Sequence, residues 1–159
     1  MSLSQNKNVL VSLGAFVMVF FIALAFFFIG DGRDRINGLI FFPEPARKGL
    51  SGEPRRIYRQ ETLEGNVRLL INEMLLGPMN IRHTSIFPMN TRLKSVLIRE
   101  GVAYVDFTPD LLFPGAGARL SFDELLAAVR QTVLYNFRQL ADVIITINGQ
   151  EPGYASFIP

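Results

Sequence analysis

Few residues of this chain are of types that carry catalytic chemistry, and they do not form a known pattern. There is no cysteine and only one histidine, His83, which excludes thiol catalysis, disulfides and cysteine-ligated metals. A Ser-His-Asp hydrolase would have to use His83, but the sequence contains no G-x-S-x-G motif. His83 lies in a polar turn without an obvious partner, so we expect it to be a surface loop residue.

The acids that could serve as a general base are Asp106 and Asp110, which flank the end of a predicted strand. A cation site with oxygen ligands needs several acids that converge. Helix capping already explains Asp123 and Glu124, and a turn explains Asp110. We therefore expect no catalytic residue, no cofactor and no metal, and an enzyme that uses Asp106 or Asp110 as general base remains an alternative.

The loop after this strand is unusually apolar, since it begins Leu111-Leu112-Phe113-Pro114. Such side chains either fold back over the core or present a contact surface. If they present a contact surface, these four residues and Arg119 are the candidate partner-contact residues. The tail over 154–158 poses the same alternative.

The N-terminal sequence indicates a membrane anchor. Val9 to Ile29 is a run of 21 residues without a charge. A helix of that length reaches about 30 Å, the thickness of the hydrocarbon core of a bilayer, and it satisfies its own backbone hydrogen bonds, as lipid requires. We predict a single transmembrane helix over 9–29, between a short segment 1–8 and a linker 30–35.

Other interpretations of this run fit less well. A cleaved signal peptide usually has about 7–15 apolar residues followed by small side chains, whereas this run ends Phe26-Phe27-Phe28-Ile29. A buried helix would need a larger protein around it. The charge pattern alone does not decide on which side of the membrane the domain lies. By the positive-inside rule, the basic residues after the run favour a cytoplasmic domain, but this rule is strongest for short loops.

The 130 residues from Gly30 onward suit one small domain and carry nearly balanced charge, with 15 Lys and Arg against 14 Asp and Glu. This balance argues against a nucleic-acid partner, which would favour a concentrated basic surface. We assign 36–150 to the domain and 151–159 to a tail. Runs rich in β-branched and aromatic residues predict strands over Ile36–Phe42, Glu53–Arg59, Leu93–Arg99, Val102–Phe107 and Asp142–Ile147.

Two segments have helical periodicity with one apolar stripe each. The first spans Thr62–Leu76 and is ended by Gly77-Pro78; the second spans Ser121–Phe137 and begins with a capping box. Pro43 is expected to end the first strand. The fold class is α/β (α+β), in the order β-β-α-β-β-α-β, with both helices packed on one mixed sheet.

Several of these elements carry a family resemblance. The helix end over 67–78, VRLLINEMLLGP, is similar to that of the GerM-type sporulation and germination (GerMN) domain. The segments that follow resemble the same domain in order and spacing: Ser85–Pro88, Thr91–Val96, Gly101–Thr108, the serine-capped helix Ser121–Phe137 and the strand Val143–Gly149. The resemblance covers about residues 37–149.

This resemblance implies a location outside the cytoplasmic membrane, a role in cell-envelope processes, and a domain without catalytic residues of its own. The chain lacks the lipidated cysteine of lipoprotein members, and its apolar helix would replace it. We therefore expect a non-catalytic, single-pass membrane module that binds an envelope protein or cell-wall polymer, with lipid contacted through Val9 to Ile29. One alternative is that the enzyme considered above, using Asp106 or Asp110, acts on the cell wall. A homo-oligomeric structural ring component is a further alternative.

Overall fold

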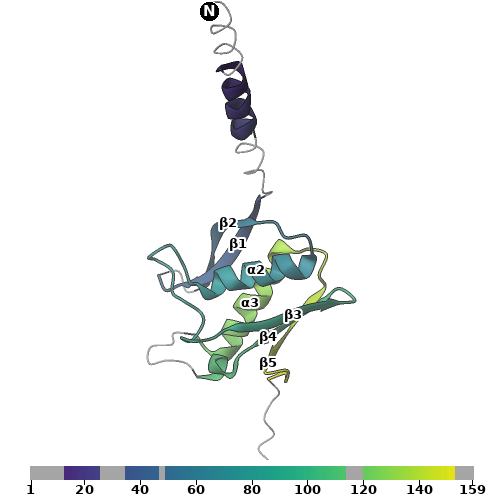
Figure 1. The fold of residues 1–159 in the computed structure, drawn as a ribbon. Helices are drawn as coiled ribbons and strands as arrows, with labels where there is room; N and C mark the ends of the chain where they lie inside the picture. The colour runs from purple at the N-terminus through teal and green to yellow at the C-terminus, as the bar shows by residue number, and fades with distance from the viewer. Residues whose placement is uncertain (1–12, 26–34, 47–48, 114–119, 153–159) are drawn as a thin grey trace, which may run out of the picture. The chain divides into compact units, whose positions relative to one another are not determined.

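The structure, a computed structural model, describes residues 13–25, 35–46, 49–113 and 120–152 (Figure 1). The chain divides into two compact units, Met1–Asp34 and Arg35–Pro159, and each is described by itself. The first contains a helix over residues 13–25 with exposed side chains. Within the described ranges, no helix is both long and apolar enough to cross a bilayer. The rest of the predicted anchor, 9–12 and 26–29, lies outside the described residues, as do 1–8 and 30–34.

The second unit begins with an antiparallel hairpin of β1 (Arg35–Glu44) and β2 (Gly49–Tyr58). The prediction that Pro43 ends the first strand is wrong. The N–H groups of a strand alternate between its two sides, and those of Leu39 and Phe41 point away from β2, toward side chains of α3 (Phe122–Asn136). The nitrogen of Pro43 has the same outward direction, so its missing N–H removes no bond to β2.

Both predicted helices are present, as α2 (Leu63–Leu75) and α3. At the start of α2, Thr62 Oγ1 accepts a hydrogen bond from the backbone N–H of Gly65 at 3.0 Å. The capping box at the start of α3 is confirmed, because the side chains of Ser121 and Glu124 each accept from the other's backbone N–H. Gly77, with φ of 84°, follows the end of α2 in the left-handed conformation that glycine favours.

A second, mixed sheet contains β3 (Leu93–Arg99), β4 (Val102–Phe107) and β5 (Asp142–Ile147), and all three strands have the predicted bounds. β3 and β4 are antiparallel and joined by Glu100 and Gly101, which both have positive φ, as a tight hairpin turn requires. β4 and β5 are parallel, and the crossover between them contains the short 3-10 helix η1 (Pro109–Leu112) and α3.

The prediction of a single mixed sheet is wrong, because the hairpin and the three-stranded sheet are separate. Asn136 of α3 closes the outer edge of β1: its amide accepts from Leu39 N at 2.8 Å and donates to Leu39 O at 2.7 Å. Thr132 Oγ1 accepts from Phe41 N at 3.1 Å. On β2, Pro54 lies opposite Leu39 and offers no donor at the other edge.

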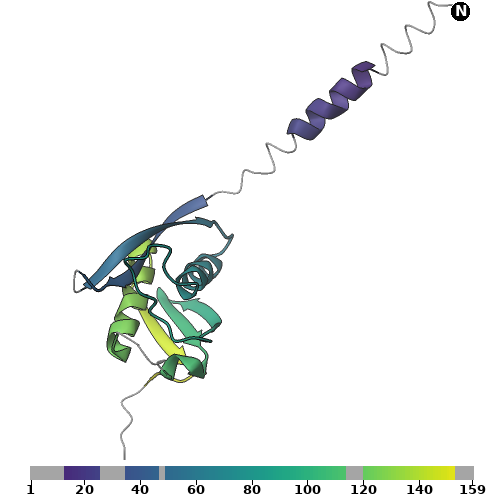
Figure 2. The ribbon, with the colours of Figure 1, turned by 90° about the vertical axis from the view of Figure 1, so that its left-hand side faces the viewer.

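The helices instead join the two sheets. α3 contacts β1 and β5, while α2 contacts β3 and β1, and both views place the helices between the hairpin and the three-stranded sheet (Figures 1 and 2). The core forms where these layers meet, with fully buried Phe42, Met74, Phe107 and Val129. Each such side chain stabilises the fold by about 1.5–3 kcal/mol.

The closure of β1 by Asn136 can be tested with Asn136→Leu, which keeps the side-chain size but leaves the N–H and C=O of Leu39 without partners. We expect the free energy of unfolding of the full chain in mild detergent to fall by about 1–3 kcal/mol, measured by urea titration with circular dichroism. Gln131→Leu, at an exposed position of the same helix, is the control and should change it by less than about 0.5 kcal/mol. Equal effects would contradict the role of Asn136.

Candidate functional site

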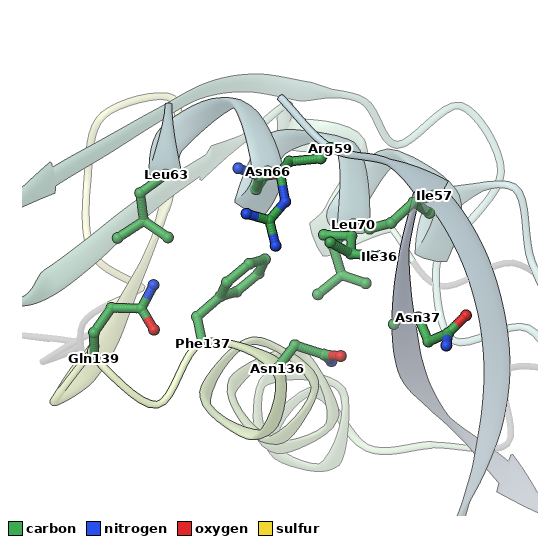
Figure 3. A pocket seen from close by; sticks show the side chains of 11 residues that line it. Ile36, Asn37, Ile57, Arg59, Leu63, Asn66, Leu70, Asn136, Phe137 and Gln139 are labelled. Atoms are coloured by element: carbon green, nitrogen blue, oxygen red, sulfur yellow. The ribbon is translucent and has the colours of Figure 1, made fainter. Parts of the chain in front are cut away.

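A pocket of about 260 Å³ opens where β1 and α2 begin and β2 and α3 end (Figure 3). We call it the amide pocket because side-chain amides dominate its polar lining. Arg59 and Phe137 point into it from opposite sides (Figure 3). The polar lining consists of Asn37, Arg59, Asn66, Asn136 and Gln139, and the apolar lining of Ile36, Ile57, Leu63, Leu70 and Phe137.

Two of these amides are fixed by the protein itself. Asn66 accepts from Gln60 N at 2.9 Å and donates to Thr62 O at 2.7 Å, while Asn136 holds the edge of β1. Asn37 and Gln139 belong to exposed positions. Because a carboxamide has both donors and an acceptor, the lining suits neutral groups such as hydroxyls and amides.

Gly38 allows the elements around the pocket to approach each other closely. A Cβ atom at this position would lie 3.1 Å from Leu70 Cδ1 and 3.7 Å from Asn136 Oδ1. The amide pocket could not be predicted from the sequence, since its residues come from four separate segments with no shared spacing. A glycine inside a predicted strand was the one available signal for close approach.

A second hollow of about 480 Å³ lies beside the turn of the β1–β2 hairpin and the start of α3. Its lining is mostly apolar and includes Pro43, Leu50, Leu120 and Ala127. Its Glu124 carboxylate accepts hydrogen bonds from Ser121 within the capping box. This hollow therefore offers less directional recognition than the amide pocket.

The candidate partner-contact residues have different environments. Leu111, in η1, is 1% exposed and belongs to the core, whereas Leu112 and Phe113 are 49% and 71% exposed. Pro114 and Arg119, like the tail 154–158, lie outside the described residues. Among the candidate partner-contact residues that the structure describes, Leu112 and Phe113 are thus the exposed ones.

The expectation that His83 is a surface loop residue without a partner is wrong. Its side chain is 4% exposed, and Nδ1 lies 3.0 Å from Glu53 Oε2. The imidazole also stacks on Phe42, with ring centroids 6.2 Å apart. The partner lies thirty residues earlier, on β2, where no local pattern connects it to the histidine.

Glu53 is the centre of a polar cluster that we call the Glu53 network: Glu53, Arg55, Glu73 and His83. The side chains of Glu53, Arg55 and His83 are buried, and that of Glu73 is partly exposed. Arg55 donates from Nε to Glu53 Oε1 at 2.9 Å and from Nη2 to Gly77 O at 2.7 Å. Its Nη1 lies 3.3 Å from Glu73 Oε2. The network therefore ties β2 to the last turn of α2 and to the glycine that follows it.

Burial, the largest single influence, would raise the pKa of Glu53. Hydrogen bonds from the backbone N–H groups of Met79 and Asn80 and from the side chains of His83 and Arg55 outweigh it, and together they lower the pKa from 4.5 to about 2. Glu53 is thus a structural carboxylate, fully ionised near neutral pH.

Asp106, a general base in the enzyme alternative, is also engaged in structure. Its Oδ1 accepts from Thr146 Oγ1 at 2.9 Å and from Gly149 N at 2.8 Å. Burial raises the pKa of Asp106, but these bonds and the nearby Lys94 ammonium lower it below its usual value. Such a carboxylate is a weak base. In the described part of the chain, no three His, Asp or Glu side chains converge on a position for a metal.

The Glu53 network predicts a pH dependence of stability. Because the pKa of Glu53 is lower in the folded chain than its ordinary value, ionised Glu53 stabilises the fold above about pH 4.5, and this contribution of about 3 kcal/mol is lost as the pH falls toward 2. Glu53→Gln should remove that part of the acid dependence in urea titrations of the full chain between pH 6 and pH 2.5. Glu61→Gln, at an exposed position, should keep it; a Glu53→Gln variant with the wild-type acid dependence would contradict this assignment.

Comparisons with solved structures give the same fold. The first GerMN domain of the sporulation protein GerM from Bacillus subtilis matches with a TM-score of 0.58 and 15% identity, over 73% of this chain and 85% of that one. The tandem GerMN domains of GerM match with a TM-score of 0.55 and 15% identity, over 74% of this chain and 41% of that one. This chain thus spans less than half of the tandem-domain chain. A comparison with curated protein sequences gave no match.

A family model identifies the domain itself. The model named Germane, described as sporulation and spore germination, matches residues 40–152. This range runs from Ile40 in β1 to just beyond β5 and takes in both helices and the three-stranded sheet. The resemblance stated from the sequence is confirmed, and the chain belongs to the Germane family of sporulation and spore germination domains.

Proposed function

We propose that this protein is a non-catalytic binding module of the bacterial cell envelope, held at the cell membrane by its N-terminal helix. The amide pocket is its ligand site, and the domain lies outside the cytoplasm. The amide pocket carries the proposal, because it is a defined recognition surface built at the junction of four elements without a reactive group.

The pocket lining favours a neutral polar ligand. Arg59 is the one charged residue among its lining residues. Asn66 and Asn136 are held by bonds to the backbone, so Asn37 and Gln139 are the amides that offer a ligand donors and acceptors in similar number. A volume of about 260 Å³ is slightly smaller than that of sites for drug-sized ligands, which start at about 300 Å³. This size and chemistry fit one sugar unit of a wall glycan, with its hydroxyl and acetamido groups.

Membrane attachment is supported by the sequence of the first unit. The uncharged run from Val9 to Ile29 has the length that a bilayer requires. Family membership supports the envelope location, because the family is described by sporulation and spore germination. Attachment would hold the amide pocket near wall polymers and raise their effective concentration.

The positions of the acids also support a binding role over the enzyme alternative. Glu53, Asp106 and Glu124 each accept hydrogen bonds that hold a turn or a helix end. These bonds lower the pKa of each carboxylate, whereas a general base must reach the substrate with a pKa near the working pH.

The ligand class can be tested by sedimenting the detergent-solubilised full chain with purified, protein-free cell-wall sacculi. We expect the wild-type chain to sediment and the double variant Asn37→Ala/Gln139→Ala to bind about tenfold more weakly, because two hydrogen bonds of about 0.5–1.5 kcal/mol each are lost. Asn72→Ala, which removes an exposed amide of α2 outside the pocket, is the control. If the double variant binds like the wild type, the amide pocket is not the site; if nothing sediments, the wall glycan is not the ligand.

The membrane anchor and the side of the membrane on which the domain lies can be tested separately from the ligand. The full chain should stay in the membrane pellet after alkaline carbonate extraction, and Val17→Arg/Phe20→Arg should release it, since each arginine at a helix centre costs about 2.5–3.5 kcal/mol in lipid. Gln131→Arg adds a charge to the domain surface and should have no effect. Protease added to intact spheroplasts should digest the domain; its protection would place the domain in the cytoplasm.

A further inference from the structure

The connection between α2 and β3 presents large apolar side chains to solvent. Leu76 and Met79 are each 78% exposed, and Ile81 is 100% exposed. The three residues lie within six positions of one another. Apolar side chains gathered in this way, unlike isolated ones, indicate a contact surface.

Ile81 stands at the tip of a tight turn. The backbone N–H of His83 donates to Asn80 O at 3.0 Å, and that of Arg82 donates to Asn80 Oδ1 at 3.0 Å. These bonds close a turn over Asn80–His83, which we call the Ile81 turn, with Ile81 and Arg82 at its two central positions.

The buried carboxylate of Glu53 clamps both ends of this turn. Its Oε2 accepts from Asn80 N at 3.0 Å and lies 3.0 Å from His83 Nδ1, while Oε1 accepts from Met79 N at 2.9 Å. The backbone on either side of Ile81 is therefore fixed from inside the domain. A surface that is ordered before contact loses less conformational entropy when it binds.

The exposed charged residue of the Ile81 turn is basic. No Asp or Glu occurs in the sequence from Met74 to Arg99, a stretch that contains four basic residues; of these, Lys94 pairs with Asp106 and Arg99 with Glu100. Arg82 and Arg92 belong to exposed positions. The nearest acids of the network, Glu53 and Glu73, are paired with Arg55. The exposed apolar side chains of Met79 and Ile81 beside the exposed basic Arg82 match the chemistry of an anionic bilayer surface.

We propose that the Ile81 turn docks on an anionic lipid bilayer, with Met79 and Ile81 entering the boundary between head groups and acyl chains and Arg82 at the head groups. The inference rests on the proposed membrane anchorage, which keeps the domain beside the bilayer. A second attachment point would orient the domain on the membrane, which the anchor alone does not do.

The test uses the full chain and the absence of native cysteine. Ile81→Cys carries an environment-sensitive fluorophore, and Gln131→Cys, on an exposed face of α3, carries the same label as the control. Both chains are reconstituted into vesicles of phosphatidylcholine alone or with phosphatidylglycerol. Flotation reports the anchor, and quenching by lipid-borne quenchers reports the position of the label.

We expect the label at position 81 to shift to the blue and to be quenched in anionic vesicles, while the label at 131 stays in water. Adding Arg82→Gln to the labelled chain should lower the docked-to-undocked ratio about fivefold, since one basic residue near an anionic surface contributes about 1 kcal/mol. A chain that floats with the vesicles while its label at 81 remains in water overturns the lipid contact and leaves the anchor intact. Failure to float refutes the anchor, and the label response on mixing with preformed anionic vesicles then decides the lipid contact separately.

Discussion

The carboxylate of Glu53 is the point on which the arrangement of the domain depends. It is 8% exposed, and a charge withdrawn from water must find partners inside the protein. Four donors supply them, from β2, the loop after α2 and the buried His83. Because three of these donors, Met79, Asn80 and His83, lie 26 to 30 residues later in the chain, satisfying one charge fixes where the chain goes after α2. The Ile81 turn is the solvent-exposed part of the segment that Glu53 holds in place.

The other organising constraint is the closed edge of β1. Thr132 and Asn136 bind backbone groups that would otherwise pair with another strand, so the hairpin stays separate from the three-stranded sheet. The last turn of α3 must then lie against the start of β1, and Gly38 leaves the room for it. The amide pocket is the space that remains between these elements. The bonds that separate the two sheets thus also shape the proposed binding site.

These constraints explain what the sequence could and could not predict. Leu93–Arg99, Val102–Phe107, Asp142–Ile147 and both helix starts depend on local signals, namely alternation, helical periodicity and caps, and these were predicted correctly. The single sheet, the end of β1 at Pro43 and the surface position of His83 were wrong, because each depends on a partner distant in the chain. The amide pocket was missed for the same reason. Local patterns specify the elements, whereas buried polar side chains decide how the elements meet.

The use of polar residues in this way also bears on function. Two acids with little exposure, Glu53 and Asp106, have lowered pKa values because backbone and side-chain donors hold them. What the domain presents to solvent is different in kind: side-chain amides around the amide pocket, and apolar and basic side chains on the Ile81 turn. Groups of this type bind without reacting. A domain whose enclosed acids, Glu53 and Asp106, are committed to its own architecture is better suited to binding than to acid–base chemistry, and the specificity of the proposed binding must come from the shape that those acids maintain.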